Sequence, residues 1–257
     1  MHWLAERLQA IPGVVAVTLG GSRARGAELP DSDWDFGLYY RGHLDAGHLR
    51  AFGHPGTVVD PGEWGRLMNG GAWWTLDGIK VDVLYRDLDV VESWAALAEQ
   101  GRFEIDPLLG HLAGWPTYAL AGELALGRQL TGPPLPRPQF PPVLRESAPP
   151  SWRWRAQFHR TYAEHHADRG DQRAAAAVRT RADFEEAHAR LAERGEWALN
   201  EKGLLARAGL DTGVENGPAT GPNPTTAVAT TTAVDFTSTA TAPVPLDPAG
   251  RPPGPRG

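Results

Sequence analysis

The first hundred residues consist of short apolar runs separated by turn residues, a pattern typical of alternating helices and strands. Apolar positions in 2–10 recur at helical spacing and stop before Pro12-Gly13, which predicts a short helix. Asp77-Gly78 separates two apolar runs and indicates a tight hairpin, because both central residues of such a turn take a positive φ. Strands are predicted over residues 14–19, 34–40, 73–76 and 79–85, and further helices over 45–51 and 88–100.

An antiparallel hairpin combined with strands that helices separate predicts an α+β fold, a small mixed β-sheet with flanking helices. Three Ala- and Arg-rich helices are predicted later, over 151–170, 171–195 and 196–209. After residue 210 the chain is dominated by Thr, Pro, Ala and Gly and lacks the apolar content that a packed core requires. The predicted organisation is a first domain at 1–132, a Pro-rich linker at 133–150, an α-helical domain at 151–210 and a disordered tail at 211–257.

Composition excludes several kinds of site and partner. The chain has no cysteine, which rules out disulfides, thiolate zinc sites and cysteine nucleophiles. Residues 1–150 carry 12 basic and 18 acidic side chains, so this part repels polyanions such as nucleic acid and attracts metal ions or polycationic molecules. No apolar run reaches the ~20 residues of a membrane span, and the N-terminus turns polar too early for a signal peptide. We therefore expect a cytoplasmic protein without a nucleic-acid or membrane partner.

The chemically informative stretch begins where the first predicted strand ends, at Gly20-Gly21-Ser22. Glycines at this point leave backbone N–H groups exposed and place no Cβ in the way of a ligand, so a phosphate can approach closely. Taken alone, such a glycine pair more often forms an ordinary turn. Its meaning depends on what surrounds it.

Three acidic residues lie on the strands that follow. Asp33 and Asp35 are two positions apart, so their side chains point to the same face of the strand. Asp82 lies within an apolar strand, where a carboxylate is costly to bury unless it is paired or binds a metal. If the two strands are neighbours, the three carboxylates converge beside the glycine turn. Mg²⁺ prefers carboxylates, waters and substrate phosphates as ligands, so the grouping predicts metal-assisted phosphoryl or nucleotidyl transfer.

These residues resemble the nucleotidyltransferase superfamily related to DNA polymerase beta, and in particular its bacterial minimal and aminoglycoside-type branch. The pattern of that family is a Gly-Ser turn, a gap of about ten residues, an Asp-x-Asp strand and a later acid between apolar residues. Gly21-Ser22, Asp33-Trp34-Asp35 and Asp82 match it in order. The resemblance is specific over roughly residues 14–86 and only architectural over the helical segment. Gly20 departs from the aromatic or aliphatic residue of many members, and Trp34 is large for its place.

The resemblance implies a nucleotidyltransferase catalytic domain in residues 1–132. It implies that Gly20, Gly21 and Ser22 form the nucleotide-binding loop, with the last two holding the β- and γ-phosphates. Arg25 would brace that loop by pairing with a nearby acid, or would touch phosphate. The site acids Asp33, Asp35 and Asp82 would bind two Mg²⁺ ions and carry the catalysis. The co-substrate would be a nucleoside triphosphate, with ATP expected.

Two kinds of function stay open at this point. The first is transfer of a nucleoside monophosphate to a hydroxyl, with release of pyrophosphate. The expected acceptor is a hydroxylated small molecule, an aminoglycoside included, because an acidic cleft attracts a polycation. A protein hydroxyl is a further possibility for the acceptor. The second is an antitoxin-like module that keeps the fold and acts through a partner protein.

Other side chains are more readily explained as structure. The tryptophans at 73–74 and 152–154 are interpreted as packing rather than as a platform for a sugar or base. His159, His165 and His166 lack an acid that would complete a metal site, so they are interpreted as a helix face. Glu104 and Glu123 are the carboxylates considered as a general base, although surface or capping roles are commoner for such residues.

Overall fold

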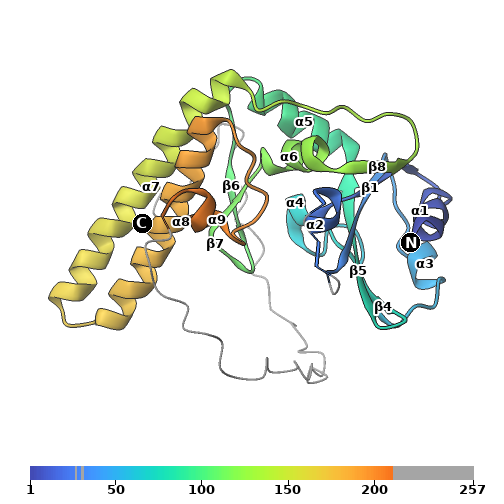
Figure 1. Ribbon diagram of the computed structural model, residues 1–257, viewed down its shortest axis with the longest axis horizontal. Coiled ribbons are helices and arrows are strands. Elements are labelled where there is room, and N and C mark those ends of the chain that lie inside the picture. The colour runs from blue at the N-terminus through green and yellow to red at the C-terminus, as the bar shows by residue number, and fades with distance from the viewer. Residues whose placement is uncertain (27, 30–31, 211–257) are drawn as a thin grey trace, which may run out of the picture. The chain divides into compact units, whose positions relative to one another are not determined.

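The computed structural model describes residues 1–26, 28–29 and 32–210, which form a six-stranded sheet, a separate two-stranded hairpin and surrounding helices (Figure 1). The strands are β1 (Val14–Leu19), β2 (Trp34–Tyr40), β3 (Gly56–Val58), β4 (Gly71–Leu76), β5 (Ile79–Asp87), β6 (Ile105–Leu108), β7 (His111–Pro116) and β8 (Arg128–Thr131). The helices are α1 (His2–Gln9), α2 (Gly21–Ala24), α3 (Gly47–Arg50), α4 (Gly65–Met68), α5 (Leu88–Ala98), α6 (Ala119–Leu126), α7 (Pro142–Asp168), α8 (Gln172–Arg194) and α9 (Leu204–Arg207). The predicted mixed sheet with flanking helices, followed by a helical segment, is confirmed, and the long helices of that segment are the pair α7/α8.

The six strands run in the order β3-β4-β5-β2-β1-β8. Only β2 and β5 are parallel neighbours; the other pairs in this sheet are antiparallel. The predicted hairpin turn joins β4 to β5, with φ of 50° at Asp77 and 80° at Gly78. The parallel contact between β2 and β5 decides which acidic residues meet, because residues in register on parallel strands share a face.

The two faces of the sheet have different roles. One face buries side chains such as Phe36, Leu38 and Val83 against the apolar sides of α1 and α3. The opposite face carries Asp35, Asp82 and Arg86 among smaller apolar patches, and α5 and α6 pack over part of it. The alternation of apolar and polar positions along β2 and β5 therefore gives one buried apolar face and one face that carries charged side chains.

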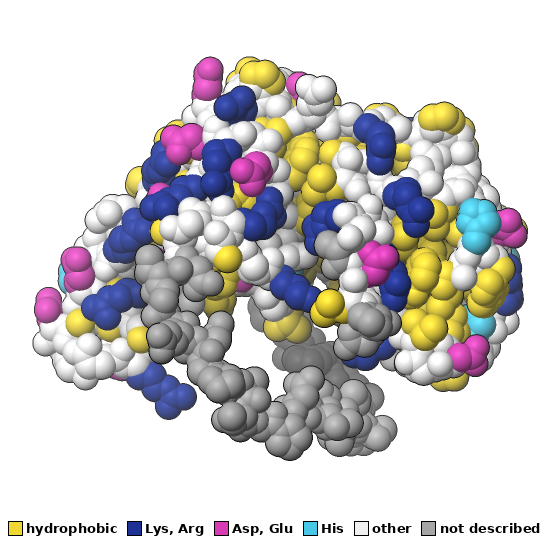
Figure 2. Space-filling view, viewed as in Figure 1, with side chains coloured by type: hydrophobic (Ala, Val, Ile, Leu, Met, Phe, Trp, Pro, Cys, Tyr) yellow, Lys and Arg dark blue, Asp and Glu magenta, His cyan; other side chains and the backbone are white. Residues whose placement is uncertain are grey.

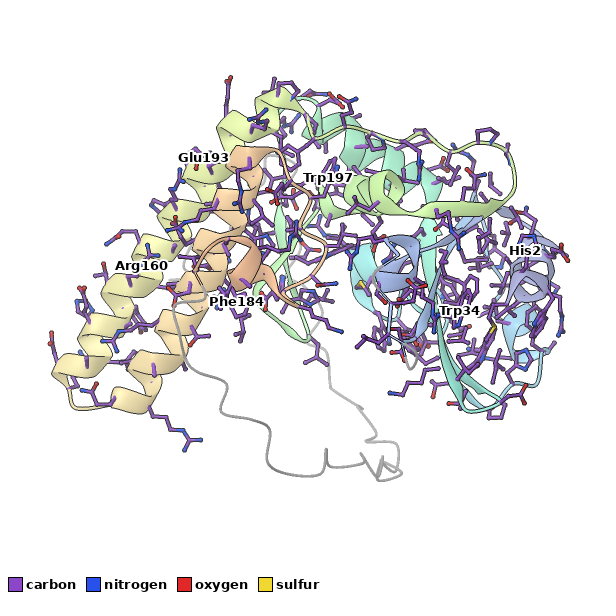
Figure 3. All side chains as sticks on the ribbon, viewed as in Figure 1. His2, Trp34, Arg160, Phe184, Glu193 and Trp197 are labelled. Carbon is purple, nitrogen blue, oxygen red and sulfur yellow. The ribbon has the colours of Figure 1, made fainter. Side chains whose placement is uncertain are left out.

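The helical pair α7/α8 packs along its length and supplies a second core. Trp152 on α7 is fully buried, and its indole N–H donates to the hydroxyl of Tyr118, which precedes α6. The chain then leaves α8 at Gly195 and passes next to α6, where Trp197 lies (Figure 3). This passage brings a segment from the end of the described chain close to the sheet.

Two predictions for the second half are wrong in detail. The stretch 133–150 is not extended throughout, because α7 begins at Pro142 and contains Pro149 and Pro150. Proline is tolerated in a first turn, and burial of Leu144, Ala148 and Trp152 offsets the hydrogen bonds lost at the two internal prolines.

The third predicted helix, 196–209, is helical only over α9, since tertiary contacts hold the residues before it in an irregular path. The sequence prediction also missed β3, β6, β7, β8, α4 and α6, most of them short. The division into domains stays a prediction, and the expected disordered tail at 211–257 lies outside the described residues. In the described part of the chain, no helix is long and apolar enough to cross a membrane.

Candidate active site

The predicted phosphate turn lies between β1 and α2 and is tied to the acidic strand. The amide of Gly20 donates to the carbonyl of Asp35 over 2.7 Å, so this N–H group already has a hydrogen-bond acceptor within the protein. Gly21 has a φ of +61°, and a Cβ built on it would lie 1.8 Å from Oδ2 of Asp35. Two features therefore require glycine at position 21: the positive φ of its backbone and the carboxylate of Asp35 beside it. The amides at the start of α2, at Gly21 and Ser22, have no partner within their own helix.

The structure brings the three predicted acids together. Asp35 on β2 lies directly opposite Asp82 on β5 in parallel register, and Asp33 precedes β2. Burial raises the pKa of Asp82 to about 6, with further contributions from the negative charges of Asp35 and Asp33. Burial and Asp33 also raise the pKa of Asp35. The conditional prediction that the two strands are neighbours is confirmed, and the acids repel one another as a group.

The residues fit a divalent cation in one specific sense. Two partly buried carboxylates side by side, next to exposed amides, need positive charge to be ionised together, and Mg²⁺ with its own waters and a substrate's phosphates supplies it. Within the described residues, no three Asp, Glu or His side chains are arranged to hold one ion by themselves. The fitting arrangement is thus the pair Asp35 and Asp82 completed by ligands that a substrate brings.

Positive charge comes from three segments that are far apart in sequence, at α2, on β5 and between α8 and α9. Lys202, Arg25 and Arg23 each lower the pKa of Asp35, in that order of effect, and Lys80 lowers that of Asp82. Lys202 lies in the segment between α8 and α9, and Lys80 lies on β5. These are the two lysines of the whole chain. Both counter the charge of the acidic group.

The residue that braces the loop is Arg23, where sequence reasoning offered Arg25. Nε and Nη2 of Arg23 donate to the carbonyl of Ser32 at 3.1 and 2.6 Å, and Nε also donates to the carbonyl of Asp33 at 3.1 Å. The same guanidinium lies 4.6 Å from the ring centre of Trp34, a cation–π contact that gives this large side chain a structural purpose. Arg25 instead lines the cavity beside Asp35. Of the two roles predicted for Arg25, contact with phosphate is therefore the one we retain as a prediction.

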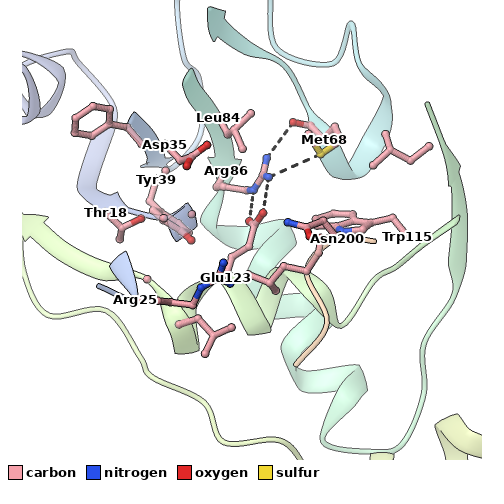
Figure 4. A pocket seen from close by; sticks show the side chains of 18 of the residues that line it. Thr18, Arg25, Asp35, Tyr39, Met68, Leu84, Arg86, Trp115, Glu123 and Asn200 are labelled. Carbon is pink, nitrogen blue, oxygen red and sulfur yellow. Dashed lines mark hydrogen bonds and ion pairs between the residues drawn. The ribbon is translucent and has the colours of Figure 1, made fainter. Parts of the chain in front are cut away.

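A cavity of about 230 Å³ opens beside Asp35 and continues under α6 (Figure 4). Its wall is formed by Gly20 and Gly21, by the face of β2 and β5 that carries Asp35 and Arg86, by the β6–β7 hairpin, and by Asn200 from the segment between α8 and α9. At its far side Arg86, only 2% exposed, forms an ion pair with Glu123, and its Nη2 lies 2.8 Å from Oε1. The cavity therefore extends from Asp35, in the candidate cation site, to the carboxylate of Glu123, which Arg86 holds.

The two carboxylates considered as a general base, Glu123 and Glu104, differ in whether they line this cavity. Glu123 lines the cavity together with Asp35, whereas Glu104 lies outside it and forms an ion pair with Arg66. Sequence reasoning had not identified Arg86, Asn200 or Lys202 as site residues. The apolar residues Val83, Leu84 and Tyr85 directly before it were the one local signal for Arg86, and the rarity of lysine was the one signal for Lys202.

The tryptophans that were interpreted as packing residues are only partly buried as a group. Trp74 and Trp152 are buried, as expected. Trp154 is 70% exposed and stacks on Phe158, which stacks in turn on Tyr162, so these three form an open ladder on α7. His159 contacts Glu185 and takes no part in a metal group among the described residues.

Comparison with known proteins agrees with this geometry. Residues 1–93 match the family model of the nucleotidyltransferase domain, and the matched segment contains the Gly-Ser turn and all three acids. The chain thus carries a nucleotidyltransferase domain over these residues, as its motifs predicted. The narrower aminoglycoside-type assignment stays a prediction.

The same comparison gives little beyond the domain. A search of curated proteins found no match to this chain. Among solved structures, the chain is similar to a nucleotidyltransferase-like protein from Exiguobacterium sibiricum 255-15, with 13% identity and a TM-score of 0.40. That similarity covers 81% of this chain and 61% of the other, so the chain spans less than two thirds of that protein. A likeness of this degree supports no inference about substrates.

Proposed function

We propose that the protein is a Mg²⁺-dependent nucleotidyltransferase that moves a nucleoside monophosphate from a triphosphate, with ATP the expected donor, to a hydroxyl of a small acceptor. The observation that carries the proposal is the junction of Gly21, Asp35 and Asp82. A turn that only glycine can occupy lies against one carboxylate, and that carboxylate lies beside a second in parallel register. Repulsion between the two carboxylates costs stability, and a Mg²⁺ ion bound together with a triphosphate relieves it.

Each residue has a definite task in this proposal. The amides of Gly21 and Ser22 bind the β- and γ-phosphates, and Arg25 and Lys202 add positive charge. Asp35 and Asp82 would hold the Mg²⁺ ions, and Asp33 adds negative charge beside them. The ions, when bound, neutralise the phosphates and the developing charge. The segment after α8 is then part of the nucleotide site, because it brings Lys202 to the acidic group.

The acceptor would enter through the cavity that ends at Glu123. Its hydroxyl oxygen forms a bond to the α-phosphorus as the bond from that phosphorus to the pyrophosphate oxygen breaks. A carboxylate takes the hydroxyl proton, and pyrophosphate leaves with the β- and γ-phosphorus atoms. Arg86 holds Glu123 in one orientation, so that its free lone pairs can accept hydrogen bonds from an acceptor's hydroxyl or ammonium groups. This favours an amino sugar, an aminoglycoside included, over an anionic acceptor.

A calorimetric titration of ATP with Mg²⁺ tests the proposal without knowledge of the acceptor. We expect binding to the wild type, and a loss of at least tenfold in affinity with Asp35→Asn. The matched control is Asp168→Asn, the same change at an exposed position on α7. Pyrophosphate release is then measured with a panel of aminoglycosides. If Asp35→Asn bound Mg²⁺-ATP as the wild type does, the assigned site would be wrong.

A partner-binding module is the second candidate function, and one observation favours it. The ladder of Trp154, Phe158 and Tyr162 on α7 exposes three stacked aromatic rings, which proteins usually cover. Under this alternative the domain acts through a partner protein, and a protein hydroxyl could serve as the acceptor. Lack of Mg²⁺-ATP binding, together with a co-purifying protein that Phe158→Ser releases, would favour it over the enzyme.

A further inference from the structure

A second cavity lies on the other side of the β6–β7 hairpin from the candidate active site. Its volume is about 510 Å³, within the range of small-molecule sites, and it lies between that hairpin and the helical pair α7/α8. The hairpin provides an aliphatic wall of Ile105, Pro107, Leu108, Leu109, Leu112 and Ala113. The helices contribute two arginines, Arg155 from α7 and Arg181 from α8. No acidic side chain of the described residues lines it.

The two guanidinium groups are held by a single buried carboxylate. Glu185 on α8 is fully buried, and its Oε1 lies 3.4 Å from Nε of both Arg155 and Arg181. Its other oxygen is 2.7 Å from Nδ1 of His159. One carboxylate thus anchors two permanent cations, which leaves an excess of positive charge at the cavity.

Hydrogen bonding at these arginines is also incomplete. Nε of Arg155 is buried, and its contact with Glu185 does not have the angles of a hydrogen bond; it has no other acceptor among the described residues. Arg181 is only partly buried, so its guanidinium can still be reached from the cavity. Carboxylate and phosphate oxygens are the acceptors that suit a guanidinium fork. Both charge and hydrogen bonding therefore favour an anionic group here.

The opposite wall is exposed aliphatic surface. Leu109 at the hairpin tip is 99% exposed and Leu112 is 51% exposed, and both line the cavity. Figure 2 shows Lys and Arg side chains, interspersed with Asp and Glu, over the helical pair. An occupant that satisfies both walls carries an anionic head for the helices and an apolar body for the hairpin.

We propose that this cavity binds a small amphiphilic anion, a carboxylate or phosphate attached to an aliphatic body, with Arg155 and Arg181 on the head and Leu109 and Leu112 on the body. The site is distinct from the nucleotide site, although Leu108 and His111 line both cavities and one hairpin separates them. The proposal stands independently of the nucleotidyltransferase reaction.

Calorimetry on the full chain tests the proposal with four probes: octanoate, octyl phosphate, octanol and inorganic phosphate. We expect one of the two amphiphilic anions, or both, to bind with 1:1 stoichiometry. Octanol and inorganic phosphate each lack half of the recognised chemistry, so they should bind at least tenfold more weakly. The comparison of octanoate with octyl phosphate distinguishes a carboxylate ligand from a phosphate ligand.

Two variants locate the binding. Arg181→Gln should weaken it at least tenfold, and Arg173→Gln, an exposed arginine on the same helix, should leave it unchanged. Because loss of Arg181 also affects buried Glu185, Leu109→Asp provides a second test: its side chain is fully exposed, so folding is unaffected, yet a carboxylate there repels the anion. Absence of binding by either anion, equal binding of octanol, or full binding by both variants would overturn the proposal. Asp35→Asn should bind the same amphiphilic anion as the wild type, with the same affinity.

Discussion

Replacement of Gly21 by alanine isolates the contact between the proposed phosphate turn and Asp35, the proposed catalytic acid. Two costs follow from the structure. The backbone has a φ of +61°, where a non-glycine residue loses about 1–2 kcal/mol. The added Cβ also lies 1.8 Å from Oδ2 and 2.7 Å from Cγ of Asp35, so the carboxylate must move. Asp35 is partly buried at the cavity edge and can rotate toward it, so this second cost appears in function more than in stability.

A matched variant separates these two costs. Gly42 has a φ of +71°, and a Cβ on it would meet nothing within 4 Å. Gly42→Ala therefore carries the same backbone penalty without a collision, in a turn after β2. Both variants should lower the melting temperature by a few degrees, since 1 kcal/mol corresponds to about 2–4 °C in a domain of this size. Only Gly21→Ala should lose Mg²⁺-ATP affinity, by at least tenfold.

The assays are thermal unfolding by circular dichroism and titration calorimetry with Mg²⁺-ATP, both on the full chain. The comparison of Gly21→Ala with Gly42→Ala is the informative measurement, because it cancels the backbone term. Mg²⁺-ATP affinity of Gly21→Ala within twofold of that of Gly42→Ala would refute the reasoning. It would mean that the position of Asp35 does not matter for nucleotide binding.

Further expectations concern the interior and the charges. Burial lowers the pKa of His188 from an ordinary 6.5 to about 3, so below about pH 6.5 the unfolded chain binds a proton that the folded chain does not. The free energy of unfolding therefore falls with pH, by about 2 kcal/mol at pH 5. Denaturant titrations should show that this loss is absent in His188→Phe. Arg86→Ala leaves Glu123 without its partner and should cost about 3–5 kcal/mol in the same titrations, whereas Arg41→Ala, in an exposed ion pair, should cost no more than about 1 kcal/mol. Lys202→Met should raise the calorimetric Kd for Mg²⁺-ATP several-fold and leave the melting temperature unchanged, and an unaltered Kd would remove Lys202 from the site.

Local pattern was sufficient for the strands that carry the chemistry. Val14–Leu19 and Trp34–Tyr40 form strands over the predicted residues, because each is a short apolar run with a glycine or arginine at its end. The Asp77-Gly78 turn was predictable for the same local reason. The acids of β2 and β5 could be assigned to one face from the period of a strand, but their direct juxtaposition required the parallel pairing, which depends on the crossover through β3 and β4.

The failures share a physical cause in tertiary contacts. The segment 196–203 is predicted as the start of a helix, yet its backbone carbonyls accept hydrogen bonds from other parts of the chain. The indole of Trp115 donates to the carbonyl of Leu199, and Arg207 donates to that of Trp197. In α7 the opposite happens, since burial of apolar side chains on both sides of Pro149 carries the helix through residues that disfavour it. Neither outcome is encoded in the residues of the segment alone.

The distribution of lysine connects these observations to the proposed chemistry. The acids at 33, 35 and 82 form a local motif, but the cation that acts most strongly on Asp35 is Lys202, which lies far along the chain on the segment after α8. That segment is also the one whose helical prediction fails. An irregular path is what allows it to approach the sheet with both Asn200 and Lys202, because a continuous helix from 196 would carry these side chains along its own axis. The irregular path that departs from local helix propensity is thus the same feature that brings Lys202 to the proposed nucleotide site.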